Sequence, residues 1–133
     1  MTGARVLVVD DEEALCCVLK DTLEMEGCEV EVCQNGQSAH ESLARSSFDV
    51  ALVDVFLSDG PSGLALGRQI LSNYPQTSLV LVTGFAEEAD IRAGYASGAY
   101  TCIRKPFILD DVIRVVRKAM DERPGAPPAR RVD

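Results

Sequence analysis

Residues 5–25, RVLVVDDEEALCCVLKDTLEM, contain the pattern that decides the fold. A short apolar, β-branched run at residues 6–9 leads through an acidic turn into a segment with helical spacing. Apolar residues at that spacing lie along one face of a helix, and we expect this face to pack on a sheet. The residues that form it are Leu15, Val18, Leu19 and Leu23.

The same pair, an apolar run followed by a helical segment, occurs five times along the chain. The predicted strands are residues 6–9, 30–33, 50–53, 79–82 and 100–103. Most of these runs are too continuously apolar for half-exposed strands, so we expect burial on both faces. Alternating strands and helices with right-handed crossovers predict an α/β fold, a doubly wound five-stranded parallel sheet flanked by five helices.

The remaining helices follow from the same spacing. Three are predicted at residues 37–44, 64–72 and 86–96. The segment 86–96 contains Gly94 and several alanines, so it has little to bury and its position is adjustable. The last helix presents an apolar stripe formed by Leu109, Val112, Ile113, Val116 and Met120.

Length and charge narrow the possible functions. The chain of 133 residues has room for one domain, which we place at residues 1–122, and the Pro/Arg-rich segment 123–133 is expected to be a flexible tail or the start of a linker. A formal net charge of -8 opposes direct binding to nucleic acid or to an anionic membrane.

The cysteines and the single histidine predict no metal site. The five cysteines include the adjacent pair Cys16 and Cys17 and lack zinc-site spacing, so we expect buried thiols. His40 lies in a polar helical stretch and is expected on the surface. Without a secretory signal or an apolar run near 20 residues, the sequence favours a reducing cytoplasm and no membrane segment.

Three carboxylates follow predicted strands. Asp10 and Asp11 come after the first strand and Asp54 after the third, so they should meet at one edge of the sheet. At about 5 Å, each like-charge pair costs on the order of 3 kcal/mol, which favours a bound cation or a raised pKa. Oxygen ligands suit Mg²⁺. The alternative is that these aspartates only cap a helix and end a strand at a turn.

Two further strand ends carry groups that can bind a phosphate. Thr83 ends the fourth predicted strand and offers a hydroxyl donor, Gly84 permits close backbone approach, and Lys105 at the end of the fifth supplies a positive charge. Together with the carboxylates, they favour a phosphoryl-transfer site over simple capping.

This arrangement resembles the receiver domain of two-component response regulators, over about residues 5–120. The fold so implied is flavodoxin-like, of the CheY-like type. The resemblance rests on the Asp10-Asp11 pair, Asp54, Thr83-Gly84 and the run Lys105-Pro106-Phe107.

The resemblance implies that Asp54 is the nucleophile that takes a phosphoryl group from a histidine kinase or a phosphotransfer protein. Mg²⁺ would be held by Asp11, Asp54 and the main-chain oxygen of Phe56, with Asp10 assisting. The chain would catalyse only its own phosphorylation and dephosphorylation and would not be an enzyme acting on other substrates. A carboxylate nucleophile needs charge neutralisation more than a general base, which agrees with this set.

The resemblance also implies that Lys105, Thr83 and Gly84 bind the phosphoryl group and that the Lys105-Pro106 peptide is cis. The signal would leave by contact with a downstream protein, through a face that includes Tyr95, Tyr100 and the helix after Leu109. A homodimer through such a face is left open.

Receivers usually carry an aromatic residue three positions before the lysine, where this chain has Cys102. A thiol is too small to follow a shift of Thr83, so the usual coupling is in doubt. Tyr100, expected on the same strand face as Cys102, is the candidate substitute, and the alternative is that it only packs against the last helix.

The segment 55–63 after the acceptor carries Ser58 where proline is common and looks one residue longer than usual before Gly63. The resemblance implies that Phe56 and Phe85 lie at positions that tune the attack of water on the acyl phosphate in receivers. Their apolar rings predict a long-lived phosphorylated state, unless they point away from the site.

Three rival functions share parts of this pattern. A flavodoxin-like electron carrier would need a Ser/Thr/Gly-rich loop where Asp10, Asp11 and Glu12 stand. A hydrolase with an aspartyl-phosphate intermediate would need an acid at Phe56. A pseudo-receiver that binds partners without phosphorylation is favoured by Cys102 and opposed by the complete acidic set.

Overall fold

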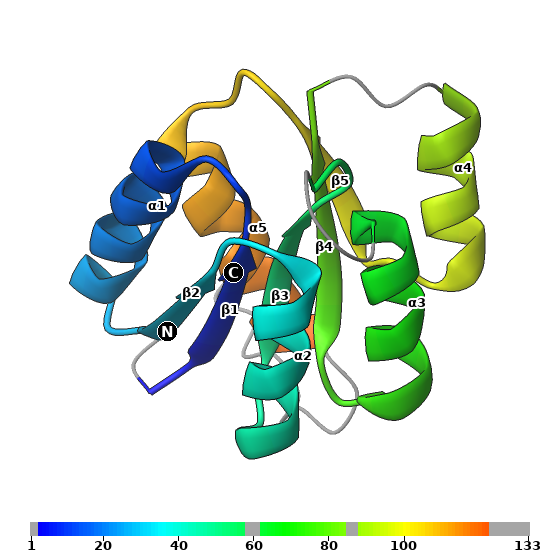
Figure 1. Ribbon diagram of the computed structural model, residues 1–133. Coiled ribbons are helices and arrows are strands. Elements are labelled where there is room, and N and C mark those ends of the chain that lie inside the picture. Colours follow the sequence, from blue (N-terminus) through cyan, green and yellow to red (C-terminus); the bar gives the residue numbers. More distant parts are fainter. Residues whose placement is uncertain (1–2, 58–61, 85–87, 123–133) are drawn as a thin grey trace.

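A computed structural model describes residues 3–57, 62–84 and 88–122 of the chain, in which strands and helices alternate (Figure 1). The strands are β1 (Arg5–Val9), β2 (Glu29–Cys33), β3 (Val50–Asp54), β4 (Ser78–Thr83) and β5 (Thr101–Arg104). The helices are α1 (Glu13–Met25), α2 (Gly36–Arg45), α3 (Gly63–Asn73), α4 (Glu88–Ser97) and α5 (Leu109–Glu122). The predicted doubly wound α/β fold is confirmed.

All strands of the sheet are parallel, in the order β2-β1-β3-β4-β5. The chain leaves β1 outward to β2 and returns to β3 on the other side, so the winding direction reverses between β1 and β3. Val8 is in register with Val32 on one side and with Leu52 on the other. Doubly wound sheets bind ligands at the carboxyl ends of strands beside such a reversal.

Two apolar layers separate the sheet from its helices. On β1, Val6 and Val8 belong to the cluster with α1 and α5, whereas Leu7 and Val9 belong to the cluster with α2 and α3. Every residue of the central strands β3 and β4 is buried, as the continuous apolar runs predict. The edge strands β2 and β5 are partly exposed.

Two apolar residues of the predicted helix stripes are exposed. Val18 is 44% exposed, because the buried face of α1 is centred on Cys16, Leu19 and Leu23. Leu109, at the start of α5, is also exposed, and the buried residues there are Val112, Val116 and Ala119. In each helix the buried face includes one small side chain that the predicted stripe omits, Cys16 in α1 and Ala119 in α5.

All five cysteines lie within the described residues and are free thiols. Cys16, Cys28 and Cys33 are buried as expected, but Cys102 is half-buried and Cys17 is exposed. The expectation of buried thiols is therefore wrong for Cys17, which points away from the sheet because its neighbour Cys16 faces the core.

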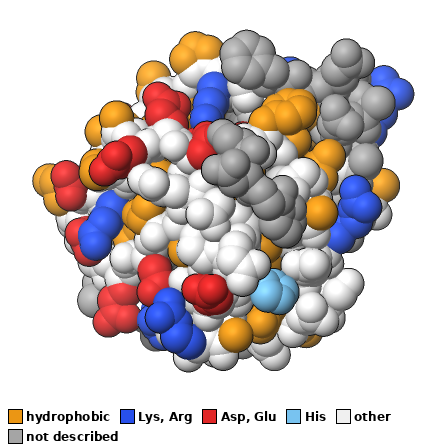
Figure 2. All heavy atoms as spheres, in the orientation of Figure 1, with side chains coloured by type: hydrophobic (Ala, Val, Ile, Leu, Met, Phe, Trp, Pro, Cys, Tyr) orange, Lys and Arg blue, Asp and Glu red, His pale blue; other side chains and the backbone are white. Residues whose placement is uncertain are grey.

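His40 is exposed, as predicted. Among the described helices, none is both long and apolar enough to cross a membrane. On the face of the molecule shown in Figure 2, acidic side chains gather where α1 and β2 lie, with a few basic side chains among them. The predicted tail, residues 123–133, lies outside the described residues.

Candidate functional site

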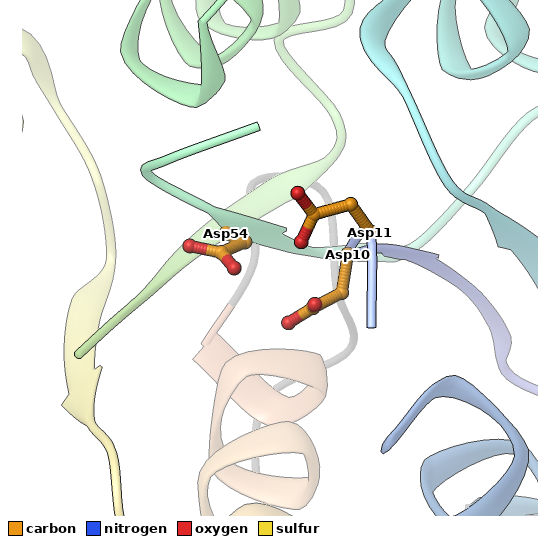
Figure 3. Close-up of side chains that lie close together, drawn as sticks. All are labelled: Asp10, Asp11 and Asp54. Carbon is orange, nitrogen blue, oxygen red and sulfur yellow. The ribbon is translucent and has the colours of Figure 1, made fainter. Parts of the chain in front are cut away.

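Three carboxylates meet at the carboxyl edge of the sheet, as predicted. Asp10 and Asp11 directly follow β1, and Asp54 is the last residue of β3. One carboxylate oxygen from each lies within 4.8 Å of the others (Figure 3). Asp10 and Asp54 are buried, whereas Asp11 is exposed. The cluster therefore opens to solvent on the side of Asp11.

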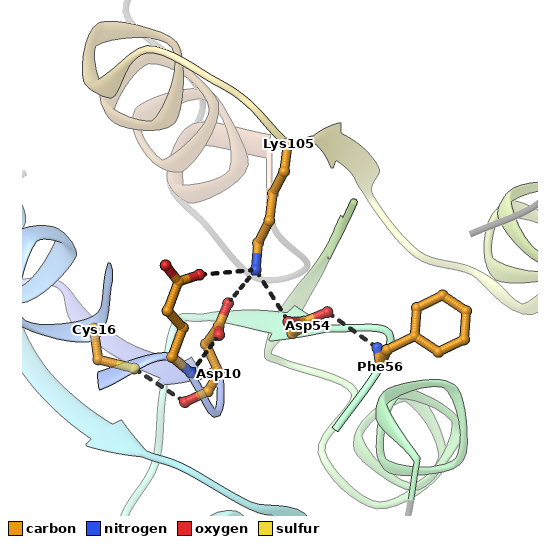
Figure 4. Close-up of polar contacts among 6 residues, drawn as sticks. Asp10, Cys16, Asp54, Phe56 and Lys105 are labelled. Atoms are coloured by element: carbon orange, nitrogen blue, oxygen red, sulfur yellow. Dashed lines mark hydrogen bonds and ion pairs between the residues drawn. The ribbon is translucent and has the colours of Figure 1, made fainter. Parts of the chain in front are cut away.

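The Lys105 side chain reaches from the end of β5 into this cluster (Figure 4). Its Nζ donates to Asp10 Oδ2 at 2.9 Å and to Asp54 Oδ2 at 3.1 Å. The backbone directs it there, because Lys105 N donates to the carbonyl of Thr83, the last residue of β4. The peptide bond to Pro106 is cis, as the resemblance implies.

Backbone donors hold the other oxygens of the two buried carboxylates. Glu12 N donates to Asp10 Oδ1 at 2.9 Å, and Phe56 N donates to Asp54 Oδ1 at 3.0 Å. On the helix side, the Cys16 thiol donates to the main-chain oxygen of Asp10 at 3.1 Å. Each of the two carboxylates is therefore fixed at both oxygens.

Burial and charge shift the pKa values in this cluster. Burial raises the pKa of Asp54, and the bonds from Phe56 N and Lys105 offset this only in part. For Lys105, burial alone would lower the pKa, but the bonds to Asp10 and Asp54 outweigh it and raise the pKa. The lysine is thus held as a cation, and the carboxylate of Asp54 is less stable as an anion than an ordinary aspartate.

The predicted phosphate-binding residues adjoin the cluster. Thr83 is buried at the end of β4, and Gly84 next to it is exposed. A Cβ on Gly84 would meet the Lys105 side chain at 3.7 Å, an ordinary contact, so the packing around it does not require glycine. The phosphate-binding roles of both residues stay predictions.

Phe56 brings its backbone to the site but not its ring. The side chain is 50% exposed and points away from the Asp54 carboxylate (Figure 4). The assignment of its main-chain oxygen as a metal ligand stays a prediction. Phe85 and the predicted departure at Ser58 lie outside the described residues.

Tyr100 and Cys102 do not share a strand face, contrary to our expectation. Tyr100 precedes β5, packs against the cluster with α1 and α5, and donates its hydroxyl to Glu122 at 2.6 Å. Cys102 packs against the opposite cluster. Alternation within a strand does not extend to Tyr100, because that residue lies in the bend that leads into β5. Tyr100 thus contacts the last helix, as the alternative to a switch role expected. A switch role for Tyr100 or Cys102 stays a prediction.

Sequence reasoning missed three residues of the site: Glu12, Cys16 and Gly63. Glu12 Oε2 lies 3.9 Å from Lys105 Nζ. Gly63 starts α3 so close to β3 that a Cβ would meet Asp54 O at 1.8 Å. Only the glycine left a signal, since a glycine shortly after a strand end often marks close backbone approach.

The donor set fits Mg²⁺. Its three carboxylates are hard oxygen ligands at the spacing of one shared cation, and the exposed side near Asp11 leaves room for the waters that Mg²⁺ retains. Because Asp10 and Asp54 already share a lysine, one added divalent cation would balance the remaining negative charge.

A doubly wound parallel sheet with an acidic cluster and a lysine at its carboxyl edge defines the CheY-like class of α/β proteins. The chain belongs to the response regulator receiver domain family, whose family model matches residues 6–117.

Individual relatives agree with this family. The chain is 32% identical over 120 residues to the uncharacterized transcriptional regulatory protein YkoG of Bacillus subtilis, covering 90% of this chain and 52% of that protein. It is 31% identical over 120 residues to the DNA-binding transcriptional regulator NtrC of Escherichia coli K12, covering 90% of this chain and 25% of that protein. The chain thus spans between a quarter and about half of these relatives.

Among solved structures, the chain is similar to a CheY-like response regulator receiver domain protein from Methanospirillum hungatei JF-1. The TM-score is 0.87 with 29% identity, over 91% of this chain and 96% of that chain. This match supports the fold over nearly the whole length of both proteins.

Proposed function

We propose that this chain is a phosphoacceptor receiver domain that takes a phosphoryl group onto Asp54. The observation that carries the proposal is the Lys105 amine held between the buried carboxylates of Asp10 and Asp54. A cation so placed is ready to bind a phosphoryl oxygen as soon as charge develops there.

The geometry suggests how the residues divide the work. Mg²⁺ would be held by Asp10, Asp11, Asp54 and the main-chain oxygen of Phe56, and would neutralise charge on the phosphoryl oxygens. A carboxylate oxygen of Asp54 attacks phosphorus, the bond from phosphorus to the donor nitrogen breaks, and that nitrogen keeps the electron pair.

Once the acyl phosphate forms, Lys105 can follow the new oxygens because its flexible side chain is already at hydrogen-bond distance from Asp54. The Thr83 hydroxyl and Gly84 backbone are the proposed further contacts. The burial of Asp54 limits access of water, which favours transfer to the carboxylate over hydrolysis of the donor.

The family implies partners at both ends of this reaction. We propose a histidine kinase or phosphotransfer protein as the donor, a downstream protein as the receiver of the signal, and the cytoplasm as the compartment. The chain would change only its own phosphorylation state. Binding to DNA is stated for longer relatives such as NtrC, and we propose no direct nucleic-acid contact for this chain, whose net charge is -8.

Incubation with acetyl phosphate and Mg²⁺ tests the proposal, with phosphorylation followed by intact mass. We expect one added phosphoryl group on the wild type, none with EDTA and none on Asp54→Asn. The matched control is Asp21→Asn, which removes an exposed carboxylate of α1 and should be phosphorylated normally. If Asp54→Asn is modified as the wild type is, the acceptor is another residue; if the wild type takes no phosphoryl group, the pseudo-receiver reading replaces ours.

A further inference from the structure

Glu12 places a further carboxylate beside the site lysine. Its Oε2 lies 3.9 Å from Lys105 Nζ. The Glu12 side chain is 61% exposed, whereas those of Asp10 and Asp54 are 4% and 8% exposed. Glu12 therefore lies at the exposed rim of the carboxylate cluster, while the two aspartates are buried within it.

The position of Glu12 in α1 does not explain its residue type. It is the N-cap of the helix, yet among the described residues its side chain makes no capping hydrogen bond. Ser, Thr, Asn or Asp would be favoured there by about 1 kcal/mol. A carboxylate does favour the positive end of a helix, but Glu13 in the first turn already supplies one. The distinctive contact of Glu12 is with Lys105.

The rim carboxylate decides the sign of the charge that an incoming donor meets. The three aspartates carry one negative charge each, and Lys105 with a bound Mg²⁺ would cancel them. Glu12 then leaves an excess of one negative charge at the exposed rim of the cluster. Because Glu12 is exposed, this charge acts mainly at low ionic strength.

We propose that Glu12 is a specificity-determining residue that disfavours small, highly charged phosphodonors relative to less charged ones. The inference rests on the proposed phosphoacceptor function of Asp54. A free acyl phosphate brings two negative charges to the cluster, and the excess charge repels it. A phosphoryl group carried on a protonated protein imidazole brings one negative charge fewer, and the excess charge repels it less.

Two small donors of different charge test the inference at low salt. Acetyl phosphate is a dianion at neutral pH and releases acetate when its phosphorus–oxygen bond breaks. Phosphoramidate is a monoanion and releases ammonia when its phosphorus–nitrogen bond breaks. For Glu12→Gln we expect phosphorylation to accelerate about twofold per donor charge, hence about fourfold with acetyl phosphate and about twofold with phosphoramidate.

Glu13→Gln is the matched control, because it removes the same charge from the neighbouring exposed position. The ratio of the two rates should stay at the wild-type value in Glu13→Gln. In Glu12→Gln the ratio should change about twofold, and the change should shrink as salt is added.

Mg²⁺ binding, measured by calorimetry without any donor, gives a second readout. Loss of the rim charge should weaken Mg²⁺ binding in Glu12→Gln by about fourfold, opposite in direction to the gain in rate with acetyl phosphate. A merely structural role would lower both. Equal acceleration with both donors, or equal effects of Glu12→Gln and Glu13→Gln, would overturn the inference alone. A wild type that accepts no phosphoryl group from either donor would overturn the proposed function and, with it, this inference.

Discussion

At the residue scale, Asp54 combines two properties that oppose each other. Its burial raises its pKa and makes the anion less stable, which improves a carboxylate as a nucleophile. The bonds from Phe56 N and Lys105 Nζ orient the carboxylate and oppose the rise in its pKa. The site therefore fixes a poorly solvated carboxylate in place. Transfer of a phosphoryl group to Asp54 would move negative charge from this buried carboxylate onto the phosphoryl oxygens.

If Asp54 is phosphorylated as we propose, the lifetime of the phosphorylated state depends on whether the Phe56 ring can cover the acyl phosphate. The Phe56 ring points away here, which is the exception that we allowed to the predicted long-lived state, so the ring must turn inward to exclude water. We predict loss on the order of tenfold faster in Phe56→Asn, because an amide can hydrogen-bond an attacking water. Phosphate release after removal of the donor measures it, with Phe56→Leu as the apolar control. Release from the wild type within seconds would contradict a long-lived state.

The buried thiol of Cys16 predicts a pH dependence of stability. Burial, followed by the charge of Asp10, raises the pKa of Cys16 to about 11. A pKa raised in the folded state gives stability that is complete below the unfolded pKa, near 9, and is lost as pH rises to about 11. At most about 2.7 kcal/mol is at stake.

Cys16→Ser keeps a donor for Asp10 O but does not titrate in this range. We expect the unfolding free energy, from urea titrations at pH 8 and 11, to fall less in Cys16→Ser than in the wild type. The exposed Cys17→Ser is the control and should follow the wild type. An equal fall in unfolding free energy from pH 8 to pH 11 in all three proteins would refute the raised pKa of Cys16.

The sequence predicted those site residues that are placed by the ends of strands. Asp10, Asp54 and Lys105 meet because parallel strands end at one edge, and that rule needs only the strand pattern. The contact of Glu12 with Lys105 depends on side-chain rotamers, which cannot be predicted from the spacing of residues in the sequence. For the same reason the sequence could not say where the Phe56 ring points.

At the scale of elements, the edge strand β5 is where prediction from periodicity was weakest. Tyr95 of α4 accepts a hydrogen bond from Cys102 N at 3.1 Å, and its hydroxyl lies 3.2 Å from Thr101 Oγ1. Tyr100 instead bonds to α5. Tertiary contacts of two helices thus fix the start and the outer edge of β5, whereas the fully buried β3 and β4 follow from their own apolar runs.

The junction of β3 with α3 gives a prediction about stability. In Gly63→Ala the new Cβ would fall 1.8 Å from Asp54 O, so α3 or the end of β3 must move. We expect a loss of about 2 kcal/mol or more in unfolding free energy, and slower phosphorylation because Asp54 moves with its backbone. Gly84→Ala, which adds only ordinary contacts near Lys105, should stay within about 0.5 kcal/mol of the wild type. A Gly63→Ala protein as stable as Gly84→Ala would show that the junction can relax.

For the whole molecule, the two core layers and the charge distribution act against each other. Helices on both faces of the sheet bury apolar side chains and stabilise the fold. The net charge of -8 destabilises it through repulsion between like charges, and three carboxylates lie close together at one edge of the sheet. The carboxylates of the candidate site thus lie where the repulsion between negative charges is strongest. A cation bound there would stabilise the whole chain, because the unfolded chain offers no assembled site.

Mg²⁺ should accordingly raise the unfolding free energy, even without a phosphodonor. At a hundred times its dissociation constant, one bound ion adds about 2.7 kcal/mol. We expect Asp11→Asn to lose most of this gain while costing little stability in EDTA, because the Asp11 carboxylate is exposed and would serve only as a ligand to the proposed ion. The exposed Asp21→Asn should keep the full gain. Urea unfolding with MgCl₂ against NaCl of equal ionic strength separates binding from screening. An equal gain in all three proteins, or none in the wild type, would mean that the cluster does not hold Mg²⁺.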